Sequence, residues 1–108
     1  MAVVLSSDQT AVQVKSAINT GGSNSCISNL TTAAQTFTAP ANAVGFVIMA
    51  ISDNTSNLRF AVGTTATASV GLRLEPGRDS GYIPLGANIS VIAESGSAQV
   101  ICVQWVAQ

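Results

Sequence analysis

The side chains that could do chemistry are five carboxylates, two cysteines and one lysine, and the chain has no histidine. Histidine is the commonest general base and metal ligand, so its absence removes the usual routes to catalysis. Glu75 and Asp79 are close enough in sequence to suggest the carboxylate pair of a glycosidase. However, they flank Pro76-Gly77, which is typical of a solvated turn. A Ser–Lys pair would have to use Lys15, which lies in the predicted N-terminal arm without rigid surroundings to position it. We therefore predict no enzyme activity and no catalytic residue.

The possible metal ligands do not make a convincing site. Cys26 and Cys102 are far apart in sequence, and without histidine or further cysteines they cannot form a zinc site from this chain alone. They could form one disulfide or remain free, buried thiols. A reducing cytoplasm favours free thiols. The segment 53–57, DNTSN, offers oxygen ligands but lacks the carboxylates of a calcium loop, so we interpret it as a turn. We expect no metal and no cofactor.

The composition points to an assembly subunit. Charged residues make up 8% of the chain and apolar residues 47%, whereas ordinary domains carry about 25% charged residues. The longest apolar run, 43–51, is much shorter than the ~20 residues of a membrane-spanning helix. The net charge of -1 and the scattered basic residues argue against nucleic acid and membrane surfaces as partners. We expect other chains, or Ser, Thr, Asn and Gln side chains, to cover much of the surface.

The first part of the chain, 1–30, is predicted to be an extended arm followed by a loop. It has no secretory signal, so we expect synthesis and first use in a cytoplasm. Its apolar residues include an alternating pair typical of a strand exposed on one face. The segment 19–25, NTGGSNS, has the composition of a loop or hinge. The arm residues expected to contact a partner are Val3, Val4, Leu5, Val12 and Val14.

The remainder, 31–108, is predicted to be a single β-sandwich domain. Short apolar or alternating segments recur with Gly, Pro or Asn between them, which is the pattern of an all-β sandwich or barrel. The expected strands are 36–38, 44–51, 58–62, 72–75, 82–83, 89–93 and 100–106, with a hairpin turn at 94–97. One more strand from the arm would suit an antiparallel jelly roll, although an immunoglobulin-like order stays open. The expected core is Phe37, Phe46, Ile48, Leu58, Phe60, Val62, Leu72, Leu74, Ile89, Val91, Ile101, Val103 and Trp105.

Segment 44–51 is apolar on both faces, so both of its faces should be covered. Arg59 and Arg73 stand on outward faces of predicted strands. They could pair with Glu75 or Glu94 across the sheet, which we favour, or contact a neighbouring subunit. Trp105 and Tyr82 could form a sugar-stacking platform, but Trp105 shares a face with core residues. The predicted oligomer interface consists of Val44, Val47, Met49, Ile51, Arg59 and Arg73.

Two stretches resemble a known class of proteins. The opening VVLSSDQTAVQVK is similar to a "V-V-L-A-S-D-Q-T/S-A-V-P-V" segment of tailed-bacteriophage virion proteins, with Gln13 where Pro is common. The later stretches FTAPANAVGFVIMAISDNTSNLRFAVG and LRLEPGRDSGYIPLGANISVIAESGSAQVICVQW resemble small phage structural proteins. In these proteins a P-A-N-A turn leads into a strand and an L-x-P-G turn precedes the middle hairpin. The resemblance covers most of the chain and contains no catalytic signature.

The resemblance implies a capsid decoration, or cement, protein of a virion. Such a protein would be a homotrimer that binds the outer surface of the major capsid protein shell, and its arm would add a strand to a neighbour's sheet edge. The alternative is a tail-fibre, tailspike or adaptor module that binds a receptor, a glycan or a neighbouring tail protein. The absence of fibrous repeats and heptads, and a chain taken to start at its own Met, favour decoration. A secreted adhesin domain is a third option, disfavoured by the missing signal peptide.

Overall fold

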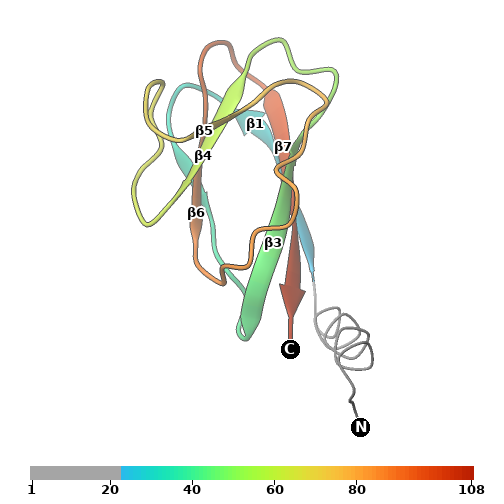
Figure 1. The fold of residues 1–108 in the computed structure, drawn as a ribbon. Helices are drawn as coiled ribbons and strands as arrows, with labels where there is room; N and C mark the ends of the chain where they lie inside the picture. The colour runs from blue at the N-terminus through green and yellow to red at the C-terminus, as the bar shows by residue number, and fades with distance from the viewer. Residues whose placement is uncertain (1–22) are drawn as a thin grey trace, which may run out of the picture.

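A computed structural model of the chain describes residues 23–108. These residues form seven β-strands and no helix, so none of them lies in a helix able to cross a membrane. The all-β prediction is confirmed. The strands, labelled in Figure 1, are β1 (Asn24–Leu30), β2 (Gln35–Phe37), β3 (Ala43–Ala50), β4 (Leu58–Val62), β5 (Leu72–Leu74), β6 (Ile89–Ala93) and β7 (Gln99–Ala107).

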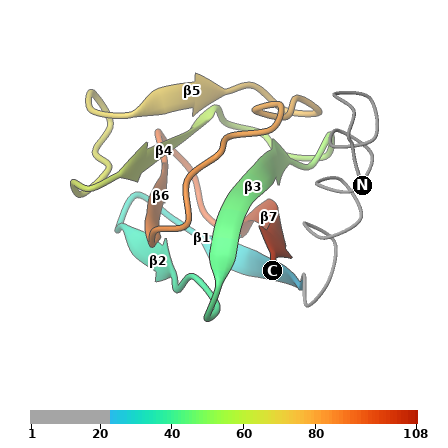
Figure 2. The same ribbon diagram turned by 60° about the horizontal axis from the view of Figure 1, so that its bottom comes forward.

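The strands make two antiparallel sheets that face each other in a sandwich-like arrangement (Figures 1 and 2). One sheet has three strands in the order β1-β7-β3, and the other has four in the order β2-β6-β4-β5. Alternation along β7 shows how the sequence produces this arrangement. Ile101, Val103 and Trp105 are buried between the sheets, whereas Gln104 is exposed on the outer face.

Aromatic side chains join the two sheets at the centre of the core. The ring of Phe46 on β3 lies 5.7 Å from that of Trp105 on β7, centroid to centroid, and 6.3 Å from that of Phe60 on β4. Edge-to-face contacts of this kind add to the stabilisation from burial. Because Phe60 belongs to the four-stranded sheet, these contacts hold the two layers together.

The predicted core is confirmed except at two positions. Val62 is only partly buried, and Leu72 is 65% exposed. Leu72 lies on β5, the edge strand of the wider sheet, where it lines an opening with Ile83 and Leu85 instead of packing between the sheets. Alternation placed Leu72 on the same face as buried Leu74, but it cannot show where the opposite sheet ends. Members of the main core cluster that the prediction missed are Leu30, Ala50 and Ala93.

Three local predictions are corrected. Residues 24–30, assigned to the arm and loop, form strand β1 and pair with β7. The 94–97 turn is not a hairpin within one sheet, because β6 and β7 belong to different sheets. The 82–83 strand is reduced to an isolated bridge between Ile83 and Phe46. Each error concerns which strand is the partner, and a local pattern does not carry that information.

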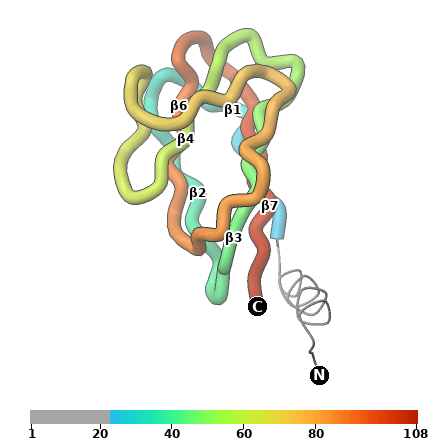
Figure 3. The backbone as a smooth tube through the Cα atoms, viewed as in Figure 1, coloured from blue at the N-terminus to red at the C-terminus, as the bar shows by residue number. Residues whose placement is uncertain are grey.

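The segment 77–83 covers the edge of β3 that faces away from β7, as the tube in Figure 3 shows. Ser80 N–H donates to Ile48 C=O at 2.9 Å, and Phe46 and Ile83 exchange backbone hydrogen bonds at 2.9 and 2.8 Å. The expected turn at Pro76-Gly77 is confirmed, with Gly77 at a φ of 82°. On the opposite side of the three-stranded sheet, β1 is an edge strand.

The 53–57 segment is a turn whose polar groups hold the end of the sandwich together. Asn54 exchanges two hydrogen bonds of 2.7 Å with the backbone of Val100. The buried Gln99 side chain accepts from the backbone N–H groups of Thr55 and Ser56 at 2.9 and 3.1 Å. The side-chain oxygen of Asn54, considered above as a cation ligand, therefore accepts a hydrogen bond within the fold.

Candidate interaction site

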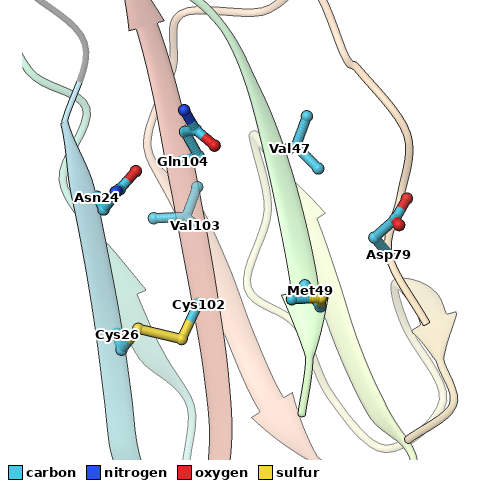
Figure 4. Close-up of a pocket in the computed structure, with 8 residues that line it drawn as sticks. All are labelled: Asn24, Cys26, Val47, Met49, Asp79, Cys102, Val103 and Gln104. Carbon is cyan, nitrogen blue, oxygen red and sulfur yellow. A yellow bond between two sulfur atoms is a disulfide. The ribbon is translucent and has the colours of Figure 1, made fainter. Parts of the chain in front are cut away.

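The outer surface of the three-stranded sheet is the most regular surface feature of the described chain, and we call it the open face. Two rows of side chains cross it (Figure 4). In one row Gln104 on β7 stands between Asn24 on β1 and Val47 on β3. In the other row Cys102 stands between Cys26 and Met49, and Asp79 continues the row beyond β3. The open face consists of Asn24, Cys26, Val47, Met49, Cys102 and Gln104.

A shallow groove of about 270 Å³ lies along this face. Its lining combines the open-face residues with Asp79 and Val103. Met49 is 41% exposed and Val47 is half-buried, so the groove has an apolar floor that no part of residues 23–108 covers. Asn24 and Gln104 lie towards one end and Asp79 lies at the side of β3 (Figure 4). Such a surface can bind an apolar segment with a polar or cationic end.

Cys26 and Cys102 form a disulfide on the open face. This corrects the expectation of free, buried thiols. The two residues are direct register partners in neighbouring antiparallel strands, so both side chains point to the same face and the sulfur atoms meet. The bond ties edge strand β1 covalently to central strand β7. The disulfide could have been predicted if 24–30 had been recognised as a strand paired with β7. The separation of the two cysteines in sequence carries no such information.

The predicted interface residues do not gather on one surface. Val47 and Met49 line the groove, and the backbone C=O of Val44 accepts a hydrogen bond of 3.5 Å from the Tyr82 hydroxyl. Ile51 follows β3 and is half-buried. Arg59 and Arg73, by contrast, lie on β4 and β5 of the other sheet. The interface role of all six stays a prediction, and the arm residues Val3, Val4, Leu5, Val12 and Val14 lie outside the described residues.

Both arginines bind one carboxylate. Arg59 Nε and Arg73 Nε donate to Glu94 Oε2 at 2.7 and 2.9 Å. Burial alone would raise the pKa of Glu94, but the hydrogen bonds and charges of Arg73 and Arg59 outweigh it and hold the pKa below its usual value. The favoured intrachain pairing is therefore confirmed, with Glu94 as the partner.

We call the outer surface of the four-stranded sheet the covered face, because a loop covers its apolar part. The loop, 63–70, folds back over β4 and β6, where Ala66 packs with Ala61 and Ile92 in a small buried cluster. Ala66 N–H donates to the Ser90 hydroxyl at 2.9 Å and fixes the loop. The outward apolar residues of this sheet are thus buried by the chain itself.

The two carboxylates of the 75–79 turn are those considered above as a glycosidase pair. Glu75 and Asp79 line an open, polar hollow with Arg73 and Arg78, and Asp79 accepts a hydrogen bond of 2.8 Å from Gly81 N–H. Residues 23–108 contain no group of three or more His, Cys, Asp or Glu side chains that could hold a metal ion. The turn interpretation of 75–79 fits these contacts.

A second apolar opening, which the sequence did not indicate, lies between β4–β5 and the segment around Leu85. It measures about 440 Å³. Val70, Leu72 and Leu85 are 43%, 65% and 47% exposed at its rim. Among residues 23–108, no charged side chain lines this opening, in contrast to the groove with Asp79.

Comparison of the chain with models of protein families, with curated proteins and with solved structures finds no match. The arguments about function therefore rest on the residues and surfaces described above. Among these surfaces, the open face combines exposed apolar side chains, a covalently fixed edge strand and the point where the N-terminal residues join the domain.

Proposed function

We propose that this chain is a structural virion protein, a capsid decoration (cement) subunit that binds the outer surface of the major capsid protein shell and stabilises it. The observation that supports this best is the open face. Val47 and Met49 keep apolar surface exposed on a regular, disulfide-fixed sheet. Leaving apolar surface in water costs about 25 cal/mol per Å². A subunit that packs in an assembly regains this free energy, because a neighbouring chain covers the apolar surface.

In this proposal the domain is a jelly-roll sandwich that forms a homotrimer on the capsid surface. Subunits associate through apolar faces that include part of 44–51, and a neighbour then covers the open face. Three weak contacts per trimer act together at high effective concentration. The role needs no reaction and no cofactor, in keeping with the missing histidine and the low charge.

The N-terminal arm makes the capsid contact. The arm sequence joins the described domain at Asn24, the first residue of edge strand β1. Val3, Val4 and Leu5 would contact the major capsid protein, and the alternating Val12 and Val14 suit strand addition to an exposed sheet edge. The similarity of this segment to virion proteins, noted above, supports the same role.

Cosedimentation with capsid shells that lack the decoration protein tests the proposal. A chain without residues 1–18 should lose shell binding while its denaturation midpoint stays near that of the full chain. The triple variant Val3→Ser, Val4→Ser, Leu5→Ser should lose most of the binding. Its matched control, Ser6→Ala with Ser7→Ala, should bind normally. Full binding by the truncated chain would refute the arm mechanism.

A tail-fibre, tailspike or adaptor module is the second candidate. One observation favours it: Tyr82 is 46% exposed and leaves an aromatic ring available to a glycan or a tail protein. The core role that the sequence favoured for Trp105 is confirmed, because Trp105 is buried between the sheets and cannot join Tyr82 in a sugar-stacking platform. Binding of the chain to isolated tails but not to shells would favour this candidate over decoration.

A further inference from the structure

We propose that, in the free subunit, the groove on the open face binds the chain's own segment Val12–Lys15. The groove is shallow and apolar, and it is already formed by the described residues. Its occupant must offer small apolar side chains in an extended conformation and a cation at one side. This docking does not depend on the proposed function, since it follows from the groove and from the sequence that joins the domain beside it.

The attachment point favours the chain's own residues. Asn24 both begins β1 and lines the groove, so the preceding residues join the domain at the groove itself. A tethered segment has an effective concentration in the millimolar range, far above that of a separate molecule in dilute solution. The Gly21-Gly22 pair permits the chain reversal that the docking needs.

The length of the connection is sufficient. Eight residues separate Lys15 from Asn24, and an extended chain of that length spans about 30 Å. The groove crosses three strands spaced about 4.8 Å apart, so its two outer strands lie about 10 Å from each other, roughly a third of that reach. The connection can therefore turn back and still place Val12 and Val14 over the groove.

The chemistry of the segment matches the groove. In an extended conformation Val12 and Val14 point to one side, as Val47 and Met49 do on β3. Lys15 lies on the opposite side of such a segment from Val14, so its long side chain would have to reach round the edge of β3 to meet Asp79, the carboxylate beside Met49. Exposed ion pairs contribute at most about 1 kcal/mol. Apolar contact would therefore supply most of the affinity, and the ion pair would fix the direction of the segment.

The second apolar opening is a poorer site for this segment. Val70, Leu72 and Leu85 give it an apolar rim, but no charged side chain among its lining residues could pair with Lys15. The arm does not join the chain among its lining residues either. Of the two openings, the groove has both the tether and the complementary charge.

The docking has a consequence that does rest on the proposed function. A shell that binds the arm would draw it out of the groove and uncover Val47 and Met49. A neighbouring subunit could then bind the same apolar strip. In the free subunit the arm would shield that strip and limit association before the shell is reached.

The methyl signal of Met49 provides a direct test. The chain has two methionines, Met1 and Met49, so methyl labelling gives two signals. The signal that is missing from a chain without Met1 belongs to Met1, and the other belongs to Met49. We expect the Met49 signal of the full chain to differ from that of a chain of residues 19–108 by more than a line width. Val12→Ser with Val14→Ser should move it to the truncated position. The matched control Gln13→Ser, between the two valines, should leave it in place.

Charge reversal tests the orientation. Lys15→Glu should shift the Met49 signal towards the truncated position, and adding Asp79→Lys should restore it. Asp53→Lys, on an exposed turn outside the groove, should not restore it. The result that overturns the proposal is an identical Met49 signal in the full and truncated chains. A difference that disappears on dilution would also overturn it, because the occupant would then be the arm of a second copy. Shell binding is measured separately, and its absence in the full chain would refute only the proposed function.

Discussion

The outer faces of the two sheets both carry apolar side chains, but these side chains lie in different environments. On the covered face, Ala61 and Ile92 are buried beneath Ala66 of the 63–70 loop. On the open face, Val47 and Met49 are also apolar and point outward, yet residues 23–108 leave Met49 41% exposed. A strand that is apolar on both sides predicts that both sides will be covered. The comparison shows that the domain buries the outward apolar residues of one sheet with its own loop, whereas residues 23–108 leave those of the other sheet uncovered.

The two faces are also held together differently. The Cys26–Cys102 bond fixes the edge of the open face covalently. On the covered side, the ion pairs of Arg59 and Arg73 with Glu94 join β4, β5 and the end of β6. The disulfide keeps edge strand β1 in register with β7 although no other segment of residues 23–108 packs on the open face. This difference is what an interaction surface requires, because its geometry must persist while its apolar groups remain accessible.

The largest effect is expected from the disulfide. Replacing both cysteines, Cys26→Ala with Cys102→Ala, should lower the free energy of unfolding by about 4 kcal/mol, since the bond closes a long loop in the unfolded chain. Urea denaturation without reductant measures this loss. The original chain in excess reductant serves as the control and should match the variant. A loss below about 1 kcal/mol would show that the bond does not hold β1.

A matched truncation on each face comes next. Ile92→Ala on the covered face should cost about 2–4 kcal/mol, because it leaves a cavity beneath the loop. Met49→Ala on the open face should cost less than about 1 kcal/mol, since its side chain is partly in water. Equal losses in chemical denaturation would contradict the distinction between the faces.

A smaller effect than that of Ile92→Ala is expected at Glu94. Its folded-state pKa is lowered, so its stabilisation is present above the unfolded-state pKa, about 4.3, and is lost as the pH falls through the folded-state value. Glu94→Gln should therefore cost about 1 kcal/mol at pH 7, and the difference from the original chain should narrow below about pH 4. Glu75→Gln, on an exposed turn, is the control. A difference that grows towards low pH would contradict this assignment.

Alternation in the sequence was sufficient to predict most of the core. Ile101, Val103 and Trp105 show period two over a long strand, and all three are buried. Strand β1 was missed because Ser and Asn surround Ile27 and Leu30, so its sequence resembles a loop. Its order comes from pairing with β7, which is a tertiary effect.

The sequence predicted only the β3 residues of the candidate site. Val47 and Met49 follow from a strand that is apolar on both faces. The groove also needs Asn24 and Cys26 from β1 and Asp79 from the segment beside β3, and these come together only through the strand order β1-β7-β3. Short-range patterns indicate the face of a strand but not its neighbours. The same limit placed Arg59 and Arg73 in one predicted interface with Val47, although they lie on the other sheet.

Cryo-electron microscopy of the virion proposed to carry this chain tests the central claim most directly, because it shows both the location and the orientation of the domain. The account predicts density for a two-sheet domain on the outer capsid surface. The open face should be buried against a neighbour or the shell, and the 63–70 loop should face solvent. Density on the shell with the loop buried and Met49 in solvent would contradict the role of the open face. Density confined to the tail, or none in the particle, would contradict the decoration role itself.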